Sequence, residues 1–123
     1  MQTVIFDSSF LMALADKPTT WSGDILESVG KFQPVLLDCV RRELERLASG
    51  RGRKASSAKV ALEIASGFEG GPCGGASVDD EIISRALTVG ALVATTDSAL
   101  LRSLSSAHVR AVTLRGGRVS PAL

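Results

Sequence analysis

Four acidic residues stand out because each lies where a carboxylate could take part in chemistry. Asp7 directly follows residues 3–6, an apolar stretch typical of a buried strand, and Asp97 follows a second such stretch at residues 91–95. The carboxyl ends of parallel strands meet at one edge of a sheet, where open α/β sheets bind their ligands. We therefore expect Asp7 and Asp97 to lie near each other.

Two further acids are predicted at the same edge. Asp79 lies in the first turn of the helix that leads into the strand before Asp97. This helix runs antiparallel to that strand, so its first turn is expected at the same edge of the sheet as Asp97. Glu43 lies on the apolar stripe of a helix predicted over residues 39–48, between Val40 and Leu47. An inward carboxylate is costly without a partner. Four acids from four separate segments can thus gather in one pocket.

Such a cluster would favour a divalent cation. Carboxylates held close together repel and raise one another's pKa. Oxygen ligands without Cys or His favour Mg²⁺ or Mn²⁺ over zinc. Cations held in this way activate water and stabilise the charge that develops in phosphodiester cleavage.

A basic segment, residues 41–59, could supply contacts to a nucleic-acid backbone. It contains seven of the fourteen Lys and Arg residues, offset only by Glu43 and Glu45. Basic side chains that neutralise phosphates dominate the affinity of most nucleic-acid-binding proteins. We expect RNA contacts from its glycine-broken turn, at Arg51, Arg53 and Lys54.

Simpler structural roles compete with the chemical one. Asp7 and Asp97 could each be the N-cap of the helix that follows, and Asp79 could favour the helix dipole. Glu43 is hardest to explain in this way, because a glutamate in the middle of a helix has no capping role.

Other polar residues near these acids are ambiguous. Asp80 stands three residues after Ser77, the spacing of a capping box with Asp in place of Glu or Gln. Asp38 is interpreted as a cap rather than a ligand. The hydroxyl of Ser8 or Thr95 could hydrogen-bond a ligating carboxylate, so both are additional candidates with Asp80.

Strand and helix patterns alternate along the chain, which predicts one α/β domain over residues 1–123 with a mainly parallel sheet. The glycine-rich residues 66–77 are predicted to form an irregular loop. The Gly116-Gly117 pair is predicted to turn the chain into a tail. The strands are expected at 3–6, 34–37, 91–95 and 109–114, and the helices at 9–16, 21–29, 39–48, 55–65, 79–89 and 99–104.

Composition is that of an ordinary globular protein, with 45% hydrophobic and 22% charged residues and a net charge of +1. Cys39 and Cys73 lack metal-ligand spacing, and we predict that both are free thiols in a reducing cytosol. No signal pattern and no apolar run near the ~20 residues of a membrane span are visible, so we expect a cytoplasmic protein without membrane contact.

The segments that carry the acids resemble, in order and spacing, the four acidic motifs of the PIN domain family. These segments are VIFDSSFLMAL, CVRRELERL, VDDEIISRAL and VATTDSALLRSL. The resemblance implies a three-layer α/β/α fold and a Mg²⁺- or Mn²⁺-dependent ribonuclease. It also implies catalytic and metal-binding roles for Asp7, Glu43, Asp79 and Asp97, with Asp79 preferred to Asp80 as the third acid.

Several biological roles agree with this resemblance. The Asp79-Asp80 pair and the Leu-x-Arg-x-Leu pattern of residues 100–104 resemble archaeal and RNA-processing members more than toxins. A ribonuclease toxin would need an antitoxin protein as partner. Dimers are common in the family, so we expect a homodimer.

The competing hypotheses are a catalytically silent RNA-binding module and a small phosphatase. The phosphatase is disfavoured because the first strand is followed by neither Asp-x-Asp nor a phosphate-binding glycine loop.

Overall fold

The computed structural model describes residues 1–122, which form one mainly parallel sheet flanked by helices. The strands are β1 (Gln2–Phe6), β2 (Phe32–Leu37), β3 (Glu69–Gly71), β4 (Leu92–Ala94), β5 (Ala111–Arg115) and β6 (Arg118–Pro121). The helices are α1 (Ser8–Asp16), α2 (Trp21–Val29), α3 (Asp38–Ala48), α4 (Arg53–Ile64), α5 (Val78–Val89) and α6 (Ser98–Ser106). The predicted three-layer α/β fold is confirmed.

The sheet has the strand order β3-β2-β1-β4-β5-β6, and only β6 runs antiparallel to its neighbour. β1 lies between β2 and β4 and pairs with both in parallel. The chain therefore adds β2 and β3 on one side of β1 and later adds β4, β5 and β6 on the other. The carboxyl ends of β1 and β4 form the switch point at which α/β folds place a binding site.

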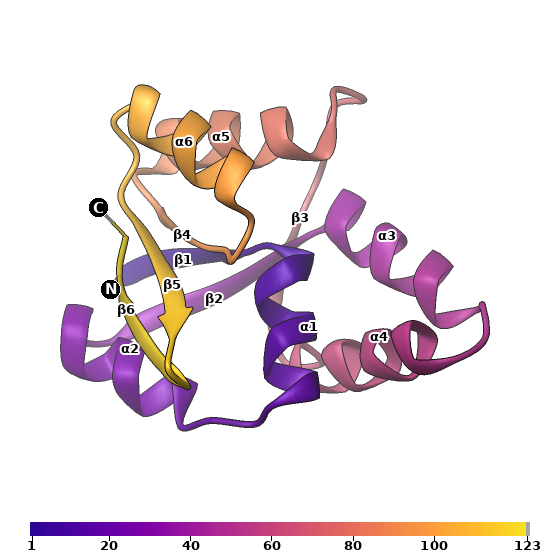
Figure 1. Cartoon of the computed structure of the whole chain (residues 1–123). Helices are drawn as coiled ribbons and strands as arrows, with labels where there is room; N and C mark the ends of the chain where they lie inside the picture. The colour runs from indigo at the N-terminus through magenta and orange to yellow at the C-terminus, as the bar shows by residue number, and fades with distance from the viewer. Residues whose placement is uncertain (123) are drawn as a thin grey trace.

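Helices cover both faces of the sheet. Figure 1 shows α5 and α6 on one side of the sheet and α1, α2 and α4 on the other. The strand residues Val4, Ile5 and Phe6 are fully buried, as are Leu36 and Leu37 of β2. Near-continuous apolar strands such as these are expected where both faces are covered, and burial of their side chains is the main force that holds the layers together.

Two short strands were not predicted from the sequence. Residues 69–71 fall within the predicted irregular loop, but they form β3, which pairs with β2. Glycine carries little strand preference, so this pairing depends on the neighbouring strand rather than on local sequence. Residues 116–117 do not lead into a tail. Gly116 and Gly117 adopt φ values of 57° and 79°, and the two-residue turn pairs β6 with β5.

The prediction that both cysteines are free thiols is wrong. Cys39, in the first turn of α3, forms a disulfide with Cys73, which follows β3. Their Cα atoms lie 6.0 Å apart although 34 residues separate them in the sequence. The parallel pairing of β3 with β2 brings these two positions together, and sequence spacing alone could not reveal it.

Within residues 1–122, no helix has the length and apolar character that crossing a membrane requires.

Candidate active site

Asp7 lies at the centre of the switch point, directly after β1. Its backbone N–H donates to the carbonyl oxygen of Ala94, the last residue of β4, at 2.9 Å. Its side chain is only 5% exposed. Asp7 occupies the N-cap position of α1, but its carboxylate makes no capping hydrogen bond. The simple capping role considered for this residue therefore does not account for it.

Two hydroxyl groups hold the Asp7 carboxylate instead. Ser9 Oγ donates to Asp7 Oδ2 at 2.6 Å, and Thr95 Oγ1 donates to the same oxygen at 2.8 Å. The two hydroxyl oxygens lie 3.1 Å apart. Because each hydroxyl has one proton, both protons are directed at Oδ2. The carboxylate is thereby fixed through one oxygen, and among residues 1–122 no hydrogen bond is made to the other.

Backbone N–H groups orient these two hydroxyls in turn. The N–H of Thr96 donates to Ser9 Oγ at 3.1 Å, and the N–H of Asp97 donates to Thr95 Oγ1 at 3.1 Å. The Thr95 side chain is fully buried. The chain turn between β4 and α6 thus holds the hydroxyls that hold Asp7, which couples the first acid to the segment carrying the fourth.

Asp97 does act as a helix cap. It is the N-cap of α6, and its Oδ1 accepts a hydrogen bond from the N–H of Leu100 at 3.0 Å. In the part of the chain that the structure describes, its Oδ2 has no hydrogen-bond partner. The side chain is exposed, so one oxygen positions the carboxylate while the other is left for a ligand. The structural and chemical roles are therefore compatible in this residue.

Glu43 is partly buried on α3, and its partner is Ser8. Ser8 Oγ, at the start of α1, donates to Glu43 Oε1 at 2.7 Å. The contact joins residues 35 positions apart and brings α3 toward the switch point. The inward glutamate therefore has the polar partner that its burial requires.

The pKa of Asp79 is raised by its surroundings. Partial burial raises the pKa of Asp79, and the negative charges of Asp7, Asp97, Glu43 and Asp80 raise it further. Asp79 lies near the start of α5, where Ser77 is the N-cap and its Oγ accepts from the N–H of Asp80. The structure thus brings the charges of the other three predicted acids to bear on Asp79.

Ser9 is a site residue that sequence reasoning did not identify. It lies in the first turn of α1, where a serine is ordinarily explained by its preference for helix starts. The spacing Asp7-x-Ser9 was the only available signal, and it becomes meaningful once Thr95 is known to approach the same oxygen.

A sequence model for the family described as PIN-like domain matches residues 4–117. The chain belongs to this family. The matched range includes all four acids and both hydroxyl residues that hold Asp7. A search of curated proteins finds no match.

Solved structures share this PIN fold. The chain resembles the PIN domain endonuclease Utp24 with a TM-score of 0.76 and 29% identity, over 97% of this chain and 90% of that one. It resembles a domain of a functionally unknown protein from Methanocaldococcus jannaschii with a TM-score of 0.64 and 15% identity, over 100% and 98%. It also resembles the T5 D15 protein, co-crystallised with metal ions, with a TM-score of 0.55 and 15% identity, over 97% and 56%.

The donor set of this PIN domain suits a hard divalent cation. The acids offer carboxylate oxygens, the ligands that Mg²⁺ and Mn²⁺ prefer. Their mutual repulsion, expressed in the raised pKa of Asp79, is the penalty that a bound cation would relieve. In the arrangement of residues 1–122, no three acidic, Cys or His side chains already form a group that could hold a metal ion.

The residues predicted to contact RNA lie just beyond the C-terminal end of α3. The disulfide lies at the opposite, N-terminal end of this helix. Arg51 lies in the turn between α3 and α4, and Arg53 and Lys54 begin α4. All three side chains are exposed. From Glu43 to the end of α3 is five residues, or about 8 Å along the helix axis. The basic turn therefore begins within about three residues of the end of the helix that carries Glu43.

Proposed function

We propose that this PIN domain is a divalent-metal-dependent endoribonuclease that acts in RNA processing or decay. The observation that carries the proposal is the Asp7 carboxylate, buried at the switch point and held through one oxygen by Ser9 and Thr95. A carboxylate fixed in this way keeps one orientation, and its charge acts on Asp79. The likeness to the PIN domain endonuclease Utp24 supports the nuclease part of the proposal.

In the proposed reaction, Asp7, Glu43, Asp79 and Asp97 would hold Mg²⁺ or Mn²⁺. The bound ion supplies Lewis-acid activation of water and of the scissile phosphate. Ser9 and Thr95 keep Asp7 in one orientation, and Ser8 does the same for Glu43. Preorganised groups of this kind reduce the reorganisation needed during reaction.

Metal dependence is the first expected result. Purified protein should cleave a single-stranded RNA with Mg²⁺ or Mn²⁺, lose that activity in excess chelator and regain it when Mn²⁺ is restored. Gel analysis of end-labelled RNA measures the cleavage, and internal products distinguish an endonuclease from an exonuclease. The DNA of the same sequence and a generic phosphomonoester serve as competing substrates.

A matched variant excludes a contaminating nuclease. Asparagine caps a helix about as well as aspartate, so Asp97→Asn keeps the start of α6 while it removes the charge. This variant should lose cleavage. Full activity in Asp97→Asn would contradict the proposal, and RNA binding without cleavage in the unaltered protein would favour the silent RNA-binding module. Turnover of the phosphomonoester alone would favour a phosphatase.

We also propose that Arg51, Arg53 and Lys54 contact RNA phosphates. Replacing all three by Gln should weaken RNA binding and reduce its dependence on salt. For a single strand the slope of log K against log salt is about 0.7 per phosphate contact, so three lost contacts should lower it by about 2. Fluorescence anisotropy of a labelled RNA, titrated at several salt concentrations, measures the slope.

The control replaces three exposed basic residues elsewhere on the surface, and it keeps the change in net charge the same. Its positions are Lys17, Lys31 and Arg115. An equal loss in both triple variants would show that total charge, rather than the basic turn, determines binding, and would contradict this assignment.

A further inference from the structure

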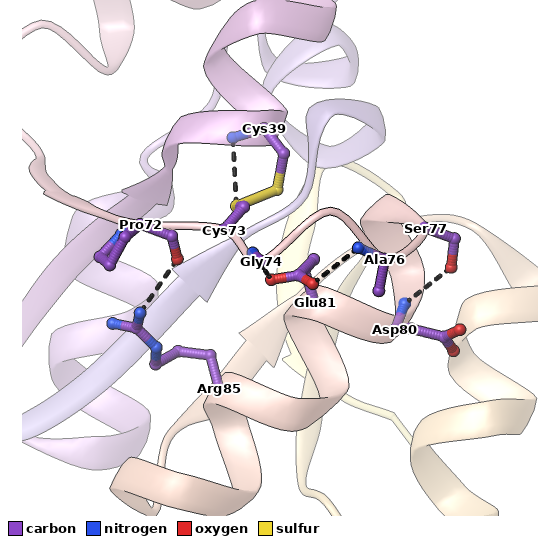
Figure 2. Close-up of a disulfide and its surroundings, with 9 residues drawn as sticks. All are labelled: Cys39, Pro72, Cys73, Gly74, Ala76, Ser77, Asp80, Glu81 and Arg85. Carbon is purple, nitrogen blue, oxygen red and sulfur yellow. Dashed lines mark hydrogen bonds between the residues drawn. A yellow bond between two sulfur atoms is a disulfide. The ribbon is translucent and has the colours of Figure 1, made fainter.

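The Cys39–Cys73 disulfide joins two segments that each lead to an acid of the site. Cys39 lies in the first turn of α3, and Glu43 follows one helical turn later. Cys73 lies in the loop between β3 and α5, and Asp79 follows six residues later. Figure 2 shows the bond between the start of α3 and this loop. The cross-link therefore restricts how far Glu43 and Asp79, two predicted metal ligands, can move relative to each other.

On its other side, the loop is held by hydrogen bonds to α5. Glu81 accepts from the backbone N–H of Gly74 at 2.7 Å and from that of Ala76 at 3.1 Å. Arg85 Nη2 donates to the carbonyl oxygen of Pro72 at 3.0 Å. These contacts, drawn in Figure 2, anchor the loop to α5. The disulfide is thus the covalent part of a connection that runs from α5 through the loop to α3.

The environment of the two sulfurs favours their release as thiolates. The backbone N–H of Cys39 donates to Cys73 Sγ at 3.2 Å. Cys39 lies in the first turn of α3, and the bond to it holds the Cys73 sulfur at the same helix N-terminus, where the helix dipole and N–H groups stabilise a thiolate. Disulfides whose thiolate products are stabilised are the more readily reduced ones.

The disulfide is also accessible. Cys39 and Cys73 are both only partly buried. Cys73 lines a surface cavity of about 300 Å³ together with Ser84, Arg85 and Thr88. A small thiol can therefore approach Cys73 from solvent.

We propose that Cys39–Cys73 is a thiol–disulfide exchange site that controls the metal affinity of the nuclease site, an inference that rests on the proposed function. A thiolate of a small dithiol attacks Cys73 Sγ, the S–S bond breaks and Cys39 leaves as a thiolate. The second thiol of the reagent then displaces Cys73. The reagent is oxidised to its disulfide while the protein gains two thiols, so atoms and electrons balance.

Opening the disulfide releases α3 from the loop, although the contacts to Glu81 and Arg85 remain. The Glu43 and Asp79 segments are then joined only through the rest of the fold. Four like charges favour their separation. We expect the oxidised protein to be the form that binds metal more tightly.

The test compares the full-length protein before and after treatment with dithiothreitol. Mass spectrometry after alkylation counts the free thiols, which should be none in the oxidised form and two in the reduced form. Hydrogen exchange of residues 72–79 should be faster after reduction. The Kd for Mn²⁺, measured by calorimetry, should rise about tenfold, the lower range for the loss of groups that orient metal ligands.

Two variants serve as controls. The double variant Cys39→Ser, Cys73→Ser should match the reduced protein and should not respond to dithiothreitol. Glu81→Gln removes the carboxylate that holds the loop to α5 while leaving the disulfide, and it should speed exchange of residues 72–79 in both redox states.

Each outcome decides a separate question. Two alkylated thiols in the untreated protein, or equal exchange and equal Mn²⁺ affinity in the oxidised and reduced forms, would overturn the inference. Absence of Mn²⁺ binding and RNA cleavage in both forms would overturn the proposed function and the control of its site with it. Cleavage by both forms at equal metal affinity would overturn only the exchange proposal.

Discussion

Asp7→Asn is expected to reduce RNA cleavage by about a hundred- to thousandfold, the effect typical of removing one preorganised charged or polar group from an active site. The substitution removes the negative charge and little else. Ser9 and Thr95 can still donate to the amide oxygen, and the N-cap position does not rely on this side chain for a capping bond. Removing one charge also relieves repulsion on Asp79, so the fold should not be weakened. Single-turnover cleavage with saturating Mn²⁺ measures the loss.

Asp38→Asn is the matched control for this prediction. Asp38 directly follows β2 as Asp7 follows β1, but its side chain is exposed. The predicted capping role for Asp38 is wrong, because Leu37 occupies the N-cap position and Asp38 lies within the first turn of α3. Its substitution should leave cleavage within about twofold, as expected for a change at an exposed surface position. Equal losses in the two variants would argue against a specific role for Asp7.

The second large effect is expected at the core residue beside Asp7. Phe6→Ala should lower the free energy of unfolding by about 3–5 kcal/mol. The Phe6 side chain is fully buried, and its ring centroid lies 5.5 Å from that of Phe10, 5.4 Å from that of Trp21 and 4.9 Å from that of Phe68. These rings come from α1, α2 and the segment before β3, so one cavity would loosen several elements at once. Urea denaturation followed by circular dichroism measures the change.

Leu87→Ala provides the comparison for the stability measurement. Leu87 is also a large apolar residue, but it is 58% exposed on α5. Alanine favours a helix and leaves no buried cavity there, so the change should stay within about 0.5 kcal/mol. A similar loss in both variants would show that Phe6 does not have the central packing role that its ring contacts indicate.

The local pattern of the chain predicted most helices closely. α2 has the predicted limits, and α5 begins after Ser77 and ends before Gly90, which adopts φ 69° as a left-handed helix end requires. These elements carry their signals in neighbouring residues, as apolar spacing and as caps. Trp21 at the start of α2 packs against the core, where its ring contacts those of Phe6 and Phe68.

The candidate site likewise combines residues that the sequence indicates with contacts that only the structure shows. Strand ends, helix starts and the apolar stripe of a helix are readable from sequence, and they indicated Asp7, Glu43, Asp79 and Asp97 as candidates. Sequence could not decide between a cap and a ligand, because both roles use the same residue at the same helix position. The hydrogen bonds make that distinction. Asp7 is held by hydroxyl groups and makes no capping bond, whereas Asp97 caps α6 through one oxygen.

By itself, the sequence determined the order of the helices and of the strands other than β3 and β6, the four candidate acids and the resemblance to the PIN family, because all of these depend on residues close together in the chain. Tertiary structure decided the contacts across long separations. Ser9 and Thr95 meet on Asp7 only because β1 pairs with β4, and Cys39 meets Cys73 only because β2 pairs with β3. Strand pairing is set by burial of the whole sheet between its helices, so no local pattern could reveal these partners.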